Sequence, residues 1–405
     1  MFSLGLHRDN LLNLADEVGS PFFFYDLDAL ENKLISLKKL PVKLWYAVKA
    51  NPLSSIIDSI AKQNISFDVA SSGELDQVLK QGVDPKNILN TGPAKSYKQI
   101  CYFIEKGVRT FVLESTQQYL NLLKATKRYN VQVTSLLRVQ ISWGDRSDEK
   151  NVLGGDSVTP FGLAPEDWVN FFKENSIEND YIDVVGLHCF QWGNITDVEK
   201  LAHLWEVITE TLVTLADQIS IDLKIIDLGG GLGIPYYNQT NEMKVEDVAE
   251  ALNQLKMKYP QVNFWLELGR YAVGECGAYV TQVIDRKKVY DKKLLILEGG
   301  SQHLGRPFIT KQAFPVKNIS KTNQEVHTVM ELHGPLCTSI DHLGSIALPE
   351  STAPGNYLAF TQTGAYGFTE SMPFFLCHTL PAEIIYTNGQ VQVVREAKQA
   401  SQWLV

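Results

Sequence analysis

What this 405-residue sequence lacks excludes several kinds of protein. Its five cysteines, Cys101, Cys189, Cys276, Cys337 and Cys377, form no C-x-x-C pair, so we expect neither a disulfide framework nor a zinc knuckle. No run approaches the roughly 18 apolar residues of a membrane span. The N-terminus has no basic segment followed by a long apolar stretch, so we expect a cytoplasmic protein in a reducing environment with no membrane partner.

Basic clusters are also absent. The sequence has 37 basic and 46 acidic residues, a formal net charge of −9, and its densest basic groups are the pairs Lys287-Lys288 and Lys292-Lys293. Binding to nucleic acid through counterion release needs clustered Lys and Arg, so we expect no nucleic-acid partner. The length suits two or three domains, and an apolar content of 44% is enough for packed cores.

The sequence alternates short β-branched or aromatic runs with stretches of helical spacing. Helices are predicted to open at Ser71, Ser115, Thr196 and Val245. Eight strand-then-helix units over about 250 residues are typical of a closed parallel barrel, so we predict a (β/α)8 TIM barrel over residues 27–280. The predicted strands are Leu44–Ala50, Ser66–Ala70, Asn87–Thr91, Thr110–Glu114, Thr134–Val139, Asp183–Cys189, Lys224–Leu228 and Asn263–Leu268.

After residue 280 the pattern changes to strands without long helices. Asn388-Gly389 is a strong signal for a hairpin turn between the last two of them. We therefore predict a mostly antiparallel β domain over residues 281–405, joined by the N-terminal segment 1–26, in which Pro21–Tyr25 reads as a strand. The predicted strands of this domain are Tyr279–Val283, Leu294–Leu297, His327–Leu332, Asn356–Thr361, Glu383–Thr387 and Gln390–Arg395.

Reactive side chains fall at the carboxyl ends of the predicted barrel strands, which all meet at one face of a parallel barrel. Each feature is weak by itself, and their shared position is the signal. These residues are Lys49, Asp68, Arg138, His188, the glycines of Gly229–Gly231, Glu267 and Arg270.

Each of these residue types supports a chemical and a plain structural interpretation. Lys49 could form a Schiff base with a carbonyl if burial lowers its pKa, or reach solvent as most such lysines do. Gly229–Gly231 could let backbone N–H groups approach a phosphate, or form a tight turn. Glu267 could face a protonated ring nitrogen, or pair with Arg270. His188 could be an ordinary core residue, and because the other histidines are dispersed we predict no metal site.

Three runs in the β domain add candidates, although each also reads as an ordinary loop. Cys337 lies between a Gly-Pro turn and Asp341, Tyr366 is flanked by small residues and offers a hydroxyl to an anion, and Arg306 follows a glycine-containing run. A guanidinium such as that of Arg306 suits a carboxylate.

Taken together, the chain resembles the fold-type III pyridoxal-phosphate decarboxylases, which include diaminopimelate, ornithine and arginine decarboxylases and share their barrel with alanine racemase. The resemblance covers almost the whole chain and implies an alanine racemase-like α/β fold. The motifs that carry it are Tyr46-Ala-Val-Lys-Ala-Asn, Phe67-Asp-Val-Ala-Ser, Gly186-Leu-His, Asp227-Leu-Gly-Gly-Gly, Glu267-Leu-Gly-Arg, Gly334-Pro-Leu-Cys and Gly364-Ala-Tyr.

This resemblance implies a role for each barrel residue. Lys49 would hold pyridoxal 5'-phosphate covalently, His188 would stack on its ring, and Glu267 would pair with the pyridinium nitrogen. Arg138 and Asp68 would support the ring and the lysine. The residues around the phosphate would be Gly230, Gly231, Gly269, Arg270 and Tyr366.

The resemblance also implies how substrate is handled. The substrate amine would replace Lys49 in the Schiff base, CO₂ would leave, and Cys337 from the partner subunit of a head-to-tail homodimer would protonate Cα. Arg306 would meet a carboxylate of the substrate. An acid at the ring nitrogen favours decarboxylation, whereas a racemase typically places arginine there. A racemase and a non-catalytic cofactor-binding regulator stay as alternatives, and the presence of both Lys49 and Cys337 speaks against the regulator.

Two departures from the family pattern leave the substrate open. Family members acting on diamines or diaminopimelate usually have an acid directly after the cysteine, where this chain has Thr338, so Asp341 is a candidate replacement. The turn Cys189–Asn194 lacks the usual serine near the phosphate, which backbone groups or Asn194 could replace. The substrate is then either free diaminopimelate, giving lysine, or an amino-acyl group on an acyl-carrier protein or a siderophore intermediate, as in a branch of secondary metabolism that the chain also resembles. The residues expected to contact it are Arg306, Cys337, Thr338, Asp341 and Tyr366.

Overall fold

The computed structural model describes residues 3–143, 158–321 and 326–404. Its residues form two compact units. The barrel unit comprises Leu34–Ile234 and Asn241–Gly269. The β unit comprises Met1–Lys33, Pro235–Thr240 and Arg270–Val405.

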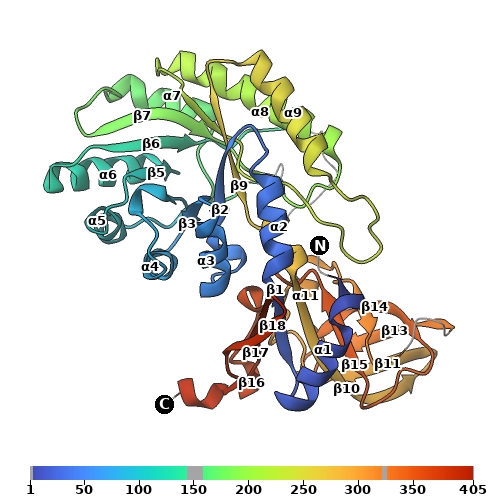
Figure 1. The fold of residues 1–405 in the computed structure, drawn as a ribbon. Coiled ribbons are helices and arrows are strands. Elements are labelled where there is room, and N and C mark those ends of the chain that lie inside the picture. The colour runs from blue at the N-terminus through green and yellow to red at the C-terminus, as the bar shows by residue number, and fades with distance from the viewer. Residues whose placement is uncertain (1–2, 144–157, 322–325, 405) are drawn as a thin grey trace. The chain divides into compact units, whose positions relative to one another are not determined.

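The barrel unit is built on a closed barrel of parallel strands, and Figure 1 shows its helices outside the strands. Every predicted barrel strand overlaps an observed one, which confirms the predicted architecture. The strands are β2 (Lys43–Ala47), β3 (Ser66–Val69), β4 (Ile88–Asn90), β5 (Thr110–Leu113), β6 (Val133–Arg138), β7 (Ile182–His188), β8 (Ile225–Asp227) and β9 (Asn263–Leu268). The helices are α2 (Leu27–Leu37), which begins in the β unit, α3 (Ser54–Lys62), α4 (Ser72–Lys80), α5 (Tyr97–Glu105), α6 (Thr116–Tyr129), α7 (Pro165–Glu174), α8 (Val198–Gln218) and α9 (Val245–Lys258).

Side-chain caps explain where several of these helices begin. Ser71 Oγ accepts the Glu74 N–H at 3.2 Å, and Glu74 in turn accepts the Ala70 N–H at 2.7 Å, which satisfies two backbone donors at the start of α4. Helix α8 begins two residues later than predicted. Asp197, and not Thr196, caps it, because one carboxylate oxygen accepts both the Glu199 and the Lys200 N–H, at 2.9 and 3.1 Å.

Large apolar side chains fill the barrel interior. Trp45, Leu89, Val112, Leu136 and Trp265 pack together there, and the two indole rings lie 4.9 Å apart. Because these side chains fill the interior, we expect a ligand to bind at the mouth formed by the carboxyl ends of the strands.

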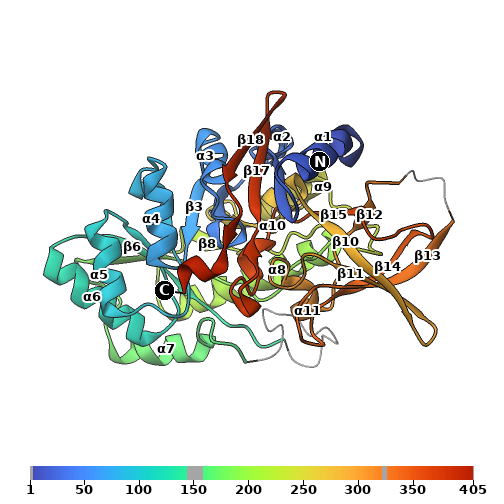
Figure 2. The same cartoon turned by 90° about the horizontal axis from the view of Figure 1, so that it is seen from below.

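The β unit contains a nine-stranded sheet and a two-stranded one. Strand β1 (Phe22–Asp26) lies between β10, to which it is antiparallel, and β17, to which it is parallel, so the predicted N-terminal strand joins this sheet. Figure 2 shows β10, β11, β13 and β14 side by side. The other strands are β10 (Gly277–Val289), β11 (Lys292–Leu297), β12 (Val316–Asn318), β13 (His327–His333), β14 (His342–Pro349), β15 (Tyr357–Thr361), β16 (Thr379–Leu380), β17 (Ala382–Thr387), β18 (Gln390–Arg395) and β19 (Lys398–Gln399).

The β unit also has elements that the sequence pattern did not predict. Strands β12 and β14 are among them, with helices α1 (Leu4–Glu17), α10 (Arg270–Val273) and α11 (Arg306–Thr310). Helix α1 buries Leu11 and Leu14 in one cluster with Phe22 and Phe24 of β1. Packing against the sheet, rather than a strong pattern of its own, therefore holds this helix in place.

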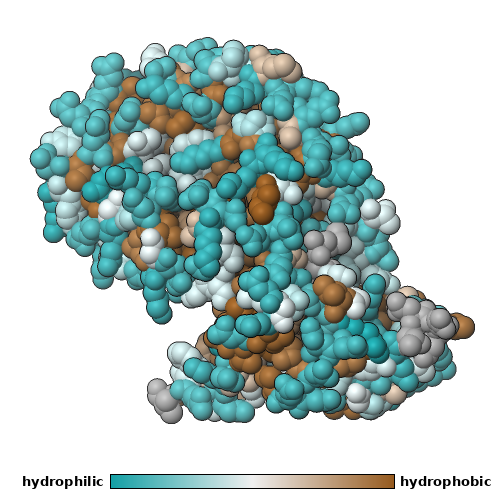
Figure 3. Space-filling model, in the orientation of Figure 1, coloured by the Kyte–Doolittle hydropathy of each residue, from teal (hydrophilic) through white to brown (hydrophobic). Residues whose placement is uncertain are grey.

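No helix among the described residues is long and apolar enough to cross a membrane. On the face seen in Figure 3, hydrophilic residues cover most of the surface of the barrel unit, and hydrophobic ones occur in scattered groups.

Candidate active site

The register of the barrel strands brings three predicted residues into one row at the mouth. Arg138, the last residue of β6, pairs with His188, the last residue of β7, which pairs with Asp227, the last residue of β8. Residues paired in register on neighbouring strands point to the same side. All three are buried.

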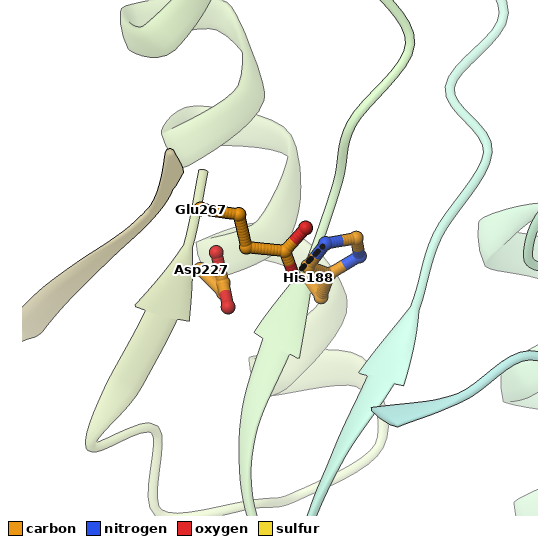
Figure 4. A group of neighbouring side chains, drawn as sticks. All are labelled: His188, Asp227 and Glu267. Carbon is orange, nitrogen blue, oxygen red and sulfur yellow. Dashed lines mark ion pairs between the residues drawn. The ribbon is translucent and has the colours of Figure 1, made fainter. Parts of the chain in front are cut away.

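Glu267 of β9 completes this group, because its carboxylate points toward the His188 ring, with Asp227 beside it (Figure 4). Glu267 Oε1 lies 3.2 Å from His188 Nε2, yet neither atom is aligned for a hydrogen bond among the described residues. Burial alone would raise the pKa of Glu267, but His188, with the charges of Lys49 and Arg138, lowers it to about 2. Burial also lowers the pKa of His188. These shifts oppose each other as regards the His188 charge, and the charges of Lys49 and Arg138 also favour the ionised form of Glu267.

The pKa of Asp227 shifts in the opposite direction to that of Glu267. Burial and the charge of Glu267 raise its pKa well above the ordinary range, although its Oδ1 accepts the Gly229 N–H at 2.9 Å. His188, Asp227 and Glu267 offer ligand atoms within 4.8 Å of one another, a spacing that a metal could bridge. A metal requires deprotonated ligands, and burial together with the charge of Glu267 disfavours the deprotonated form of Asp227.

Lys49 lies just beyond the end of β2, in the short turn Val48–Ala50. Its side chain is exposed, and its charge acts on the carboxyl groups of Asp68, Glu74 and Glu267. Asp68 is buried in β3, and burial with the charge of Glu267 raises its pKa, although the Thr91 hydroxyl donates to it at 2.6 Å. The Lys49 amine is therefore within electrostatic reach of the carboxylates at the mouth.

A buried charge cluster that sequence reasoning missed adjoins Arg138. Glu114 Oε1 lies 3.2 Å from Arg138 Nη1 and 3.9 Å from Lys95 Nζ. Burial lowers the pKa of Lys95 to about 8, although Glu114 opposes this shift. The Glu114 carboxylate thus lies close to two buried basic side chains, Arg138 and Lys95. The sequence could have indicated this cluster, because both residues follow barrel strands. Glu114 directly follows β5, and Lys95 follows β4 after Thr91-Gly-Pro-Ala.

The glycine-rich turn after β8 comes close to neighbouring backbone. A Cβ at Gly230 would lie 2.5 Å from the Glu267 carbonyl oxygen, and one at Gly231 would lie 3.3 Å from that of Trp192. Gly231 also has a φ of +98°, which side chains rarely adopt. The absence of side chains at Gly230 and Gly231 therefore lets an anion approach the N–H groups of these two residues, whereas the Gly229 N–H is already donated to Asp227.

In the β unit, two predicted guanidiniums share two aromatic rings. Arg270 lies 5.5 Å from the centre of the Tyr236 ring and 4.6 Å from that of Tyr366, and it donates to the Tyr236 hydroxyl. Arg306 lies 5.2 and 5.9 Å from the same rings. Arg306 Nη1 is 3.4 Å from Glu370, whereas its buried Nε has no hydrogen-bond partner among the described residues. Arg270 and Arg306 carry two positive charges and Glu370 carries one negative charge, so one positive charge is left to attract an anion. Gly269, which precedes Arg270, is the link to the barrel strand β9.

Cys337 lies exposed in a turn that Asp341 shapes. The buried Asp341 carboxylate accepts the Ser301 N–H at 2.7 Å through one oxygen and the Leu336 N–H at 2.8 Å through the other. Asp341 is buried and its two oxygens hold this turn, and its contact with the substrate stays a prediction. Thr338, inside the turn, accepts the Ile340 N–H through its hydroxyl at 3.4 Å.

Comparison with known families shows to which family the chain belongs. Residues 27–274 match the family described as pyridoxal-dependent decarboxylase, pyridoxal binding domain. The chain belongs to this family. It is a carboxy-lyase of fold type III, and the match covers all the strands of the barrel.

Similar proteins in this decarboxylase family differ in their substrates. The chain is 27% identical to diaminopimelate decarboxylase of Aquifex aeolicus, over 96% of this chain and 91% of the relative. It is 28% identical to a 2-[(L-alanin-3-ylcarbamoyl)methyl]-2-hydroxybutanedioate decarboxylase of Staphylococcus aureus, over 90% and 93% of the two chains. It is 22% identical to an L-glutamyl-[BtrI acyl-carrier protein] decarboxylase of Niallia circulans, over 97% and 94%. A crystal structure of diaminopimelate decarboxylase from Helicobacter pylori has the same fold, with a TM-score of 0.85 at 22% identity over 97% and 98% of the chains.

The family implies pyridoxal phosphate, and the barrel mouth fits that group. Among the described residues, three buried atoms have no hydrogen-bond partner: Glu267 Oε1 and both ring nitrogens of His188. These atoms are therefore available to contact a polar ring. The glycine turn at Gly230 and Gly231 leaves a backbone cradle that suits a phosphate. Lys49 supplies an amine to the same mouth.

Proposed function

We propose that this decarboxylase removes the α-carboxylate of an amino acid, or of the amino-acid part of a conjugate, with pyridoxal 5'-phosphate. The observation that carries the proposal is the buried Glu267 carboxylate at the barrel mouth, which faces His188 and whose pKa the neighbouring charges lower. When bound, the cofactor takes up the electron pair released as CO₂ leaves, and it does so best while its ring nitrogen is protonated. The carboxylate of Glu267 supports that proton.

Each predicted residue has a task in this proposal. Lys49 would hold the cofactor until the substrate amine takes its place, and Asp68 would support that lysine. His188 would lie against the ring face, and its burial lowers the pKa of the imidazole, which disfavours the charged form. Arg138, which pairs with Glu114, would contact the polar edge of the ring.

The phosphate is proposed to bind where backbone and cations favour a dianion. Glycines 230 and 231 offer N–H groups, and Gly269 passes directly into Arg270, whose guanidinium is stacked near Tyr366. A guanidinium and free N–H groups are the usual partners of a phosphate.

An amino-acid racemase is the alternative reaction on such a barrel. A racemase works best when the ring nitrogen of the cofactor is unprotonated, and a cation beside that nitrogen favours the unprotonated form. Here the nearest group is a carboxylate whose pKa is lowered to about 2, so it stays negative at neutral pH. Decarboxylation is therefore the better fit.

We further propose a homodimer in which Cys337 of one subunit serves the site of the other and protonates Cα after CO₂ has left. Its exposed position in the turn that Asp341 braces supports this proposal, since a buried thiol could not reach a second chain. The five free cysteines support a reducing, cytoplasmic environment.

Two classes of substrate remain in this proposal. One is free diaminopimelate, on which the Aquifex relative acts, and the other is a conjugate, on which the Staphylococcus and Niallia relatives act. In either class Arg306 is proposed to bind a carboxylate through its unpartnered Nε edge, with Thr338 and Tyr366 close to the substrate. Thr338 carries no charge for a distal ammonium, which favours a conjugate.

The test combines cofactor binding with product release. Purified protein should show the visible absorbance of bound pyridoxal phosphate and should release CO₂ from one of diaminopimelate, lysine, ornithine or carrier-linked glutamate. Lys49→Ala should lose both, whereas the matched control Lys62→Ala, at an exposed helix position, should keep both. A visible band without CO₂ from any candidate would favour a non-catalytic regulator, and a band that survives Lys49→Ala would refute the assignment of the lysine.

A further inference from the structure

The turn after β7 contains an amide group with an unmet hydrogen-bond donor. Asn194 Oδ1 accepts the Ile234 N–H at 3.1 Å. Asn194 Nδ2 is buried and has no hydrogen-bond partner in the described parts of the chain. A backbone N–H can only donate, so this bond fixes which end of the amide is oxygen and turns Nδ2 away from Ile234.

Backbone contacts, rather than the flexibility of the side chain, set the position of this amide. The Ile195 N–H donates to the Gly231 carbonyl, and the Gly233 N–H donates to the Ile195 carbonyl, both at 2.8 Å. A Cβ at Gly233 would lie 2.6 Å from the carbonyl carbon of Asn194, so only glycine admits the turn there. Asn194 has a φ of +57°, which asparagine tolerates better than most residues.

The neighbouring amide in the same turn is already occupied. Gln191 accepts the Ile141 N–H at 2.8 Å and donates to the Ile141 carbonyl at 2.9 Å. The turn Cys189–Asn194 contains no Ser or Thr hydroxyl. Asn194 is therefore the amide of this turn that can donate to a ligand at the glycine-rich loop.

We propose that Asn194 Nδ2 donates a hydrogen bond to the phosphate of the cofactor. This inference rests on the proposed function and adds a phosphate contact to it. A buried donor without an acceptor is unfavourable, and a phosphate oxygen beside Gly231 would satisfy it. A hydrogen bond to a charged oxygen is stronger than one between neutral groups.

Asn194→Asp separates this role from a purely structural one. Aspartate keeps an oxygen for the Ile234 N–H and fits the same backbone conformation, but it puts a negative oxygen in the place of Nδ2. The matched control is Asn64→Asp, because Asn64 is exposed and has the same φ of +57°. The ligands are pyridoxal phosphate and pyridoxal, which differ only in the phosphate, titrated at pH 8 and followed by absorbance.

Asn194→Asp should raise the dissociation constant of pyridoxal phosphate by about thirtyfold or more and leave that of pyridoxal unchanged, while Asn194→Ala should raise the former about tenfold. Asn64→Asp should change neither. An Asn194→Asp protein that binds pyridoxal phosphate as the wild type does, or that loses affinity for both ligands equally, would overturn the phosphate contact. A wild-type protein that fails to bind pyridoxal phosphate would instead overturn the proposed function.

Discussion

Lys95→Met tests the electrostatics of the barrel mouth most directly. Lys95 is buried and shares Glu114 with Arg138, and burial lowers its pKa from 10.5 to about 8. A fall of that size corresponds to about 3 kcal/mol by which the folded state disfavours the charged amine. We expect this penalty in the wild type and not in the variant.

The pH dependence follows from the sign of the shift. The unfolded chain binds the Lys95 proton more tightly than the folded one, so the penalty is fully present below about pH 8 and disappears as pH rises toward 10.5. The free energy of unfolding of Lys95→Met minus that of the wild type should therefore be larger at pH 7 than at pH 10, by about 2–3 kcal/mol. Hydrogen bonds lost with the lysine, such as that to the Gly92 carbonyl, shift both values equally and cancel.

Urea unfolding followed by tryptophan fluorescence at the two pH values measures this difference. Lys98→Met, a change at an exposed position of α5, is the control and should show no such dependence. Other groups that titrate in this range act on all the proteins and cancel. A difference between Lys95→Met and wild type that stays constant from pH 7 to pH 10 would refute the argument that Lys95 is buried with its proton.

Three further predictions concern the glycine turn and the shared site. Gly230→Ala should destabilise the barrel by about 1–3 kcal/mol, because its Cβ would lie 2.5 Å from the Glu267 carbonyl oxygen. The control Gly73→Ala in helix α4 should not destabilise it. Equal melting temperatures of Gly230→Ala and the wild type would show that the backbone of the turn can shift to accept the Cβ. Cys337→Ala should keep cofactor absorbance but slow or misdirect protonation of the product, measured by deuterium incorporation at Cα. Mixing Lys49→Ala with Cys337→Ala chains should restore some activity, and a lack of recovery after subunit exchange would speak against sites shared between subunits.

Local pattern determined much of the fold by itself. The barrel strands were predictable because each is a short apolar run between turn signals, and their order implied that the carboxyl ends meet. Arg138, His188 and Glu267 were predictable at the mouth for the same reason, since each stands at or next to the end of its strand. The start of α4 was also readable, because its cap involves residues only a few positions apart.

What the sequence left undetermined depends on contacts between distant residues. Helix α1 and strand β14 are held by packing and pairing with segments far along the chain, so their own patterns were weak. The role of Asp341 depends on the Ser301 N–H, forty residues away, which no local spacing encodes.

The sequence alone therefore determined the reaction family of this protein, through the order of its motifs and the residues at its strand ends. Only the tertiary structure decided which of those groups hold charge. Asp227 and Glu267 are both buried acids, yet the pKa of one is raised and that of the other lowered, because His188, Lys49 and Arg138 favour the charge on Glu267. Ionisation depends on the distances to other charges and on burial, which arise only when the chain has folded.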